Sequence, residues 1–237
     1  MAEILGQARL LRAHTSCGNS DVFVYEREGT PYLVKTFARH HWLARMLGRS
    51  AIRHEWKMLR RLQEMGFTLA PRPFALLEKD TLVMEYLDGC VPLQSRRHYG
   101  DGEQPSRECF LRLFREMAEL HRQGVAHGDL RRANLLLAPD GGVRLIDWAT
   151  GSCQEPRKWS WRLLSRWFHA NQLRSDDYSL VSIVESYYDD VLPAEFVASA
   201  RPGWLLRTGR FLRYHLYRHG IKRWFHLTEH THSRKRG

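Results

Sequence analysis

The chain has 237 residues and a mass of 27.9 kDa, and 43% of its residues are hydrophobic while 27% are charged. This composition is typical of a globular protein and excludes a disordered or fibrous chain. The 37 Lys and Arg residues outnumber the 26 Asp and Glu residues, so the formal net charge of +11 favours an anionic partner. No apolar run approaches the ~18 residues of a membrane-spanning helix, which argues against an integral membrane protein.

The N-terminal sequence and the cysteine spacing bear on the cellular compartment. Residues 1–9 lack the basic-then-apolar pattern of a secretory signal. The four cysteines lie far apart and include no C-x-x-C pair, which argues against a disulfide framework or a zinc site. We therefore expect a protein of the reducing cytoplasm.

The first third of the chain is predicted to be rich in strands. Residues 21–37 and residues 74–87 each predict a hairpin, because apolar and β-branched runs flank short turn sequences. Between these hairpins, residues 50–65 carry apolar side chains at helical spacing, and Ser50 is suited to cap that helix.

The remainder of the chain is predicted to be mainly helical. An apolar face begins near residue 105, with Ser106 as the expected cap. Short strands at 135–137 and 143–146 flank a Pro-Asp-Gly-Gly turn, and the sequence after residue 174 is again helical in pattern. A β-rich first part followed by a helical second part predicts a two-lobe α+β fold.

The positive charge is concentrated in three segments, residues 39–61, 156–174 and 201–237. The last of these holds ten Lys or Arg residues and one acidic residue. Tryptophan, tyrosine and phenylalanine are interleaved with the arginines, a pattern that suits an anionic lipid headgroup layer and also suits RNA. The pattern alone leaves both partners open.

A short stretch carries the chemistry: His127-Gly128-Asp129, Asn134 five residues after the aspartate, and Ile146-Asp147-Trp148. The Asp-Asn-Asp spacing resembles the catalytic spacing of the protein-kinase-like superfamily. In that chemistry one carboxylate orients the attacking hydroxyl and accepts its proton, a role that fits Asp129. Hard oxygen donors hold Mg²⁺ on the nucleotide phosphates, which fits Asn134 and Asp147.

Upstream residues extend this resemblance over roughly residues 14–190. Lys35 at a strand end and Glu55 twenty residues later fit the lysine that contacts the ATP phosphates and its glutamate partner. The run Leu82-Val83-Met84-Glu85-Tyr86-Leu87 resembles the fifth strand and hinge, where backbone groups of Glu85 and Leu87 would meet adenine. Gly18 would lie in the loop that covers the phosphates.

The resemblance implies a kinase-like N-lobe at residues 1–88 and a kinase-like C-lobe at residues 89–237, which includes the catalytic loop and a basic helical tail. Several features depart from regulated protein kinases. The phosphate loop has one glycine instead of three, Ile-Asp-Trp replaces Asp-Phe-Gly, and the segment before the next predicted helix is short. Asp176 fits either an aspartate that supports the catalytic loop or a helix cap.

Small, basic kinases of this kind are similar to the bacterial lipopolysaccharide core kinases. That similarity implies an ATP- and Mg²⁺-dependent enzyme that phosphorylates an inner-core sugar, either 3-deoxy-D-manno-octulosonic acid (Kdo) or heptose. It also implies a monomer at the inner membrane of a Gram-negative bacterium, bound to an anionic membrane surface and to a lipid-anchored, phosphorylated sugar rather than to nucleic acid. Two alternatives remain: an atypical RIO-type serine/threonine kinase with RNA as partner, and a kinase-like binding module without activity.

Overall fold

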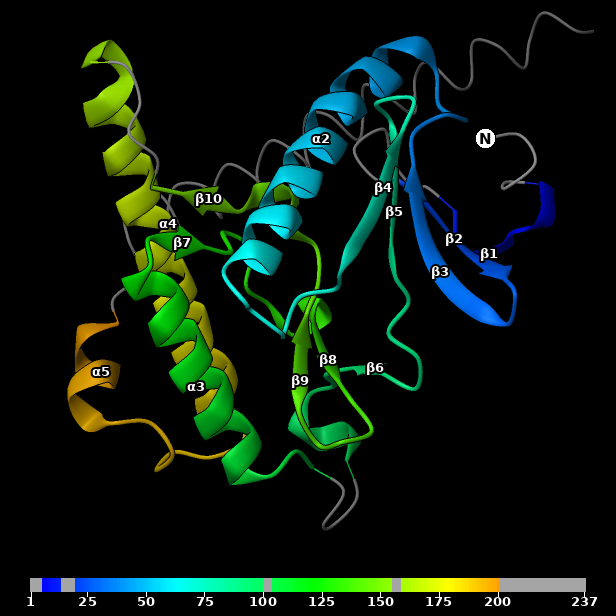
Figure 1. The fold of residues 1–237 in the computed structure, drawn as a ribbon. Coiled ribbons are helices and arrows are strands. Elements are labelled where there is room, and N and C mark those ends of the chain that lie inside the picture. Colours follow the sequence, from blue (N-terminus) through cyan, green and yellow to red (C-terminus); the bar gives the residue numbers. More distant parts are fainter. Residues whose placement is uncertain (1–5, 14–19, 100–103, 155–158, 201–237) are drawn as a thin grey trace, which may run out of the picture.

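The computed structural model describes residues 6–13, 20–99, 104–154 and 159–200. Figure 1 shows a β-sheet crossed by one long helix, and beside it a second part built from helices and short strands. This arrangement is the predicted α+β fold with two lobes. Gly18 and the basic C-terminal segment lie outside the described residues, so the structure says nothing of either.

The N-terminal part contains a five-stranded antiparallel sheet in the order β1-β2-β3-β5-β4. Its strands are β1 (Arg9–Arg12), β2 (Asp21–Arg27), β3 (Thr30–Thr36), β4 (Pro73–Leu77) and β5 (Thr81–Glu85). Both predicted hairpins are present. The β2–β3 turn places Glu28 and Gly29 at positive φ, as a tight two-residue hairpin turn requires.

Helix α2 (Trp42–Glu64) lies across this sheet and begins eight residues before the predicted start. Ser50 is therefore inside the helix and does not cap it, which corrects the sequence prediction. The buried positions continue upstream at helical spacing, because Ala44 and Gly48 precede Ile52 on the inward face. A Cβ atom on Gly48 would come within 2.2 Å of the Phe37 ring, so only glycine allows this close packing.

The C-terminal part is mainly helical, as predicted. Helix α3 (Arg107–Arg122) is capped by Ser106, whose hydroxyl accepts from the Cys109 amide at 3.2 Å. The other helices are α4 (Trp159–Glu185) and α5 (Ala194–Ser199). Helix α4 starts well before residue 174, so it includes much of the second basic segment.

Short strands connect the two parts around one hydrophobic core. They are β6 (Val91–Pro92), β7 (Val125–Ala126), β8 (Leu135–Leu137), β9 (Val143–Leu145) and β10 (Ser152–Cys153). The core cluster is continuous from Ile52 of α2 through Trp148 to Tyr187 after α4. In the described part of the chain, no helix is both long enough and apolar enough to cross a membrane.

Candidate active site

Lys35 and Glu55 form the ion pair that the sequence predicts. Lys35 Nζ on β3 lies 2.8 Å from both carboxylate oxygens of Glu55 on α2, across twenty residues of sequence. The Glu55 side chain is 3% exposed and the Lys35 side chain is 12% exposed. Burial disfavours the ammonium, but the carboxylates of Glu55 and Asp147 outweigh that effect and raise the pKa of Lys35. Lys35 therefore stays charged at neutral pH.

Asp147 joins this pair from the other half of the molecule. Lys35 Nζ also donates to Asp147 Oδ1 at 3.1 Å, so one ammonium contacts carboxylates from two separate elements. Burial alone would raise the pKa of Asp147, but the Lys35 charge and hydrogen bond lower it. Asp147 has a left-handed backbone with φ +68°, a conformation uncommon outside glycine and found preferentially at functional sites.

Asp129 is held in place by its own loop. Asn134 Nδ2 donates to the backbone oxygen of Asp129 at 2.9 Å and to its Oδ2 at 3.1 Å. Arg131 Nε lies 3.1 Å from the same carboxylate oxygen. The Asp129 side chain is 31% exposed, so it is accessible to an acceptor although it is oriented by two neighbours.

Asp176 supports the catalytic loop from α4. Its carboxylate is fully buried and accepts from the backbone amides of His127 and Gly128, at 2.6 and 2.9 Å. Asp176 lies inside α4 and not at its start, so the helix-cap alternative is wrong. A side chain on Gly128 would come within 2.6 Å of Thr150 O, and the φ of +78° there also favours glycine.

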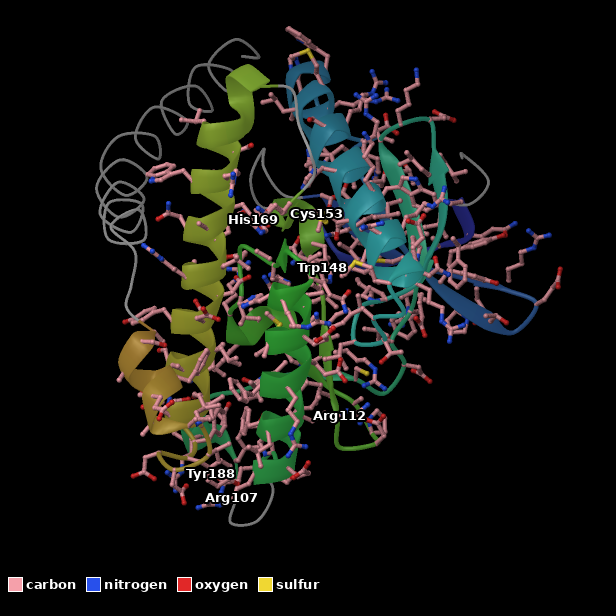
Figure 2. All side chains as sticks on the ribbon, turned by 60° about the vertical axis from the view of Figure 1, so that its left-hand side comes forward. Arg107, Arg112, Trp148, Cys153, His169 and Tyr188 are labelled. Atoms are coloured by element: carbon pink, nitrogen blue, oxygen red, sulfur yellow. The ribbon has the colours of Figure 1, made fainter. Side chains whose placement is uncertain are left out.

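His127 and Trp148 connect the catalytic loop to Asp147, a connection that the sequence did not reveal. Nε2 of His127 is 3.1 Å from the carbonyl oxygen of Ile146, and its Nδ1 accepts from the Asp129 amide at 3.3 Å. Burial lowers the pKa of His127, so the ring stays neutral and Nε2–H is the donor. The ring centroid of Trp148, a residue labelled in Figure 2, lies 4.5 Å from that of the imidazole. Trp148 thus packs at the position where regulated kinases carry Phe, and Ala149 follows at the position of their Gly.

The donor set fits Mg²⁺. The amide nitrogen of Asn134 is used by Asp129, which leaves the amide oxygen as an acceptor for a cation. Asp147 stays ionised and its side chain is 37% exposed. Within the described residues no cluster of three His, Cys, Asp or Glu residues could hold a metal alone. Mg²⁺ commonly binds one or two carboxylates together with substrate phosphates, so this sparse set suits it.

The two hinge residues lie where the sheet meets the second part of the molecule. Glu85 ends β5, and its amide donates to Arg72 O at 2.8 Å. Leu87 follows two residues later, and its carbonyl accepts from the Cys90 amide at 3.3 Å. Their contacts with a nucleotide stay a prediction. The structure thus brings Lys35, Glu55 and Asp147 into direct contact, and it joins Asn134 to Asp129.

A comparison with known families agrees with this geometry. Residues 22–165, more than half of the chain, match the model of the RIO domain. The chain belongs to this family. The matched part of the RIO domain includes both the Lys35–Glu55–Asp147 contacts and the Asp129–Asn134 loop, and it ends inside α4.

Three curated relatives show the range of proteins with which this RIO-domain chain shares sequence. The 3-deoxy-D-manno-octulosonic acid kinase of Xylella fastidiosa is 28% identical over 159 residues, which is 64% of this chain and 61% of that protein. EKC/KEOPS complex subunit bud32 of Emericella nidulans is 31% identical over 131 residues, or 44% of this chain and 46% of that protein. Sperm motility kinase 3A of Mus musculus is 27% identical over 145 residues, and the chain covers 28% of its length.

Proposed function

We propose that this protein is an ATP-dependent kinase that phosphorylates a hydroxyl of an inner-core lipopolysaccharide sugar, Kdo or heptose. The observation that carries the kinase assignment is the double contact of Lys35 with Glu55 and Asp147. In kinases the corresponding lysine contacts the ATP phosphates and pairs with a helix glutamate, and the corresponding aspartate binds Mg²⁺. The substrate class is supported by the 3-deoxy-D-manno-octulosonic acid kinase among the relatives.

Each site residue has a role in this proposal. Asp129 orients the acceptor hydroxyl and accepts its proton, while the hydroxyl oxygen bonds to the γ-phosphorus of ATP, the bond from that phosphorus to the bridging oxygen breaks, and ADP leaves. Arg131, which contacts Asp129 Oδ2, positions that carboxylate and adds positive charge beside the transferred group. Lys35 contacts the nucleotide phosphates, while Glu55 fixes its ammonium. Mg²⁺ on Asn134 and Asp147 would neutralise phosphate charge.

A hollow beside the catalytic loop supports an anionic acceptor. It has a volume of about 660 Å³ and includes Arg97, His98 and Arg132 among its lining residues. Arg132 begins the short helical turn that ends at Asn134, so this cation lies close in sequence to the proposed catalytic residues, and Arg97 lines the same hollow. A sugar acid or a sugar phosphate would complement the charge of the two arginines, whereas an uncharged peptide with a serine or threonine hydroxyl would not.

The surface of α2 supports peripheral binding to an anionic membrane. Trp42, Met46 and Leu47 near its N-terminus are 67%, 54% and 65% exposed, an apolar group suited to the lipid interface. Arg45 and Arg49 of the same segment are 2.7 and 3.4 Å from Asp80, so they also stabilise the fold. We place the enzyme at the cytoplasmic face of the inner membrane as a monomer, without nucleic acid as partner.

A transfer assay tests the proposal. The full chain, Mg²⁺ and ATP labelled on the γ-phosphate are incubated with a lipid-anchored acceptor that carries Kdo, with one that carries heptose, and with a mixture of acidic and basic protein acceptors. We expect label on a sugar acceptor and none when Asp129→Asn replaces the parent chain. Asp189→Asn, an exposed carboxylate after α4, serves as the matched control. Label on neither sugar would overturn the substrate assignment.

The family match favours a second candidate function, a RIO-type serine/threonine kinase. The short segment between Asp147 and α4 is also compatible with a RIO-type kinase. The protein arm of the same assay separates the two, because label that appears on protein alone would replace the sugar kinase by this alternative.

A further inference from the structure

A second cationic hollow lies between α2, β10 and α4, away from the Lys35–Asp147 contact. Two cavities of about 240 and 840 Å³ adjoin there and share five lining residues: His54, Ser152, Cys153, Ser165 and His169. Figure 2 shows His169 and Cys153 between the two helices. The floor is the segment that follows the active-site turn, since Gly151 O contacts His54 Nε2 at 2.7 Å.

The smaller cavity is lined by three permanent cations, Lys57 and Arg61 of α2 and Arg166 of α4. Among the residues that the structure describes, no carboxylate lines it. Arg61 also lies 4.0 Å from Glu64, an exposed pair of the kind that adds little stability. Cations that line one cavity from two helices favour an anionic ligand there, because its charge would be attracted to all three.

His169 lines the same cavity and carries a buried polar atom. Its Nδ1 is 2.7 Å from the hydroxyl oxygen of Ser152, and the residue is 5% exposed. Among the described residues Nε2 has no hydrogen-bond partner. A buried polar atom without a partner is rare and costly, and a ligand oxygen at Nε2 would remove that cost. Burial and the nearby His121 lower the pKa of His169, so the ring donates as a neutral imidazole.

The larger cavity adds apolar side chains beside these cations. Leu164, Trp167 and Phe168 of α4 line it and are 61%, 44% and 52% exposed. Three large apolar side chains on one helix flank, next to a cationic hollow, match an amphiphile whose headgroup is anionic and whose remainder is apolar.

We propose that these adjoining cavities bind the phosphate monoester of a lipid, with the phosphate at Lys57, Arg61 and Arg166 and the acyl portion along Trp167 and Phe168. Nε2 of His169 donates to a phosphate oxygen. The site is separate from the catalytic residues and needs neither ATP nor an acceptor hydroxyl. It therefore stands whether the enzyme phosphorylates a sugar or a protein.

Calorimetry with short-chain lipids tests the site on the full chain. The probes are dihexanoyl phosphatidic acid, dihexanoyl phosphatidylcholine and inorganic phosphate. Both lipids are used below their critical micelle concentrations. We expect phosphatidic acid to bind, and the variant Lys57→Gln/Arg61→Gln/Arg166→Gln to weaken it by about 10- to 100-fold. The control Arg53→Gln/Arg60→Gln removes two exposed arginines of α2 that do not line either cavity, and we expect binding to be unchanged.

Further variants distinguish a lipid site from a site for free anions. The variant Trp167→Ser/Phe168→Ser should weaken the binding of phosphatidic acid and leave the weak binding of inorganic phosphate unaltered. Equal affinity for inorganic phosphate and phosphatidic acid would reduce the proposal to a free-anion site and overturn the lipid assignment. An equal loss in the triple variant and in the Arg53/Arg60 control would overturn the site itself. Because all the substituted cations are exposed, the melting curves of these cation variants should match that of the parent chain. The single variant Arg166→Gln repeats the binding measurement with the smallest change.

Discussion

Asp176 and His127 are 49 residues apart in sequence, yet a buried Asp176 oxygen accepts from the His127 amide at 2.6 Å. The same carboxylate accepts from Gly128, so one side chain of α4 fixes the backbone immediately before Asp129. The position of the proposed base therefore depends on the packing of α4 against the catalytic loop.

Replacing Asp176 by Asn should destabilise the protein and slow transfer. The amide keeps the size of the carboxylate but removes its charge and one acceptor, so about 1–3 kcal/mol of unfolding free energy should be lost. Urea unfolding measures this change. Asp189→Asn is the control, because Asp189 is an exposed carboxylate after α4. Equal losses in both variants would contradict a specific role of Asp176 in supporting the loop.

Replacing Lys35 by Met should lower the free energy of unfolding by more than the same replacement of an exposed lysine would. It leaves Glu55, which is 2% exposed, beside Asp147 without a cation, and removal of one partner from a buried pair costs about 3–5 kcal/mol. The double variant Lys35→Met/Glu55→Leu should recover part of that loss, and neither variant should bind ATP like the parent. Thermal melting and ATP titration check both statements. A double variant less stable than the single one would refute the argument from an unpaired charge.

Replacing Asp129 by Asn should reduce transfer by about 10²–10⁴-fold and leave ATP affinity nearly unchanged, because Lys35 and Asp147 keep their contacts. Single-turnover transfer and nucleotide titration separate the two effects. Parental transfer by this variant would show that another group accepts the proton.

Stability should fall as the pH rises from about 6.5 to about 9, because of His121. Burial opposes its charge, but contacts with Asp176 and Asp177 raise its pKa to about 9 from 6.5. A base with a raised folded pKa stabilises the fold fully below its unfolded pKa and loses that contribution as the pH passes the folded value. Urea unfolding across this range measures the slope, which His121→Gln should flatten. His127 and His169 have lowered pKa values, so their protonation affects stability only below this pH range.

The sequence predicted the parts of the site that depend on local structure. Asp129 and Asn134 are five residues apart in one loop, and the β8–β9 hairpin brings Ile146 back so that its amide donates to Asn134 O at 3.0 Å. Short-range turns and alternating strands fix such distances. The strand and helix that carry Lys35 and Glu55 were predictable for the same reason, although α2 begins earlier than its Ser50 suggested.

The order of elements, the spacing of the Asp-Asn-Asp set and the excess of positive charge could be read from the sequence alone. The role of Asp176 as a support of the loop rather than a helix cap, and the cavity that Lys57, Arg61 and Arg166 line with His169, became visible only in the folded chain. The reason is that these contacts join segments far apart in sequence, 49 residues for Asp176 and His127 and about a hundred for the cations of α2 and α4. Their meeting depends on how α2 and α4 pack against the shared core, where side-chain volume and close approaches such as Gly48 against Phe37 set the geometry.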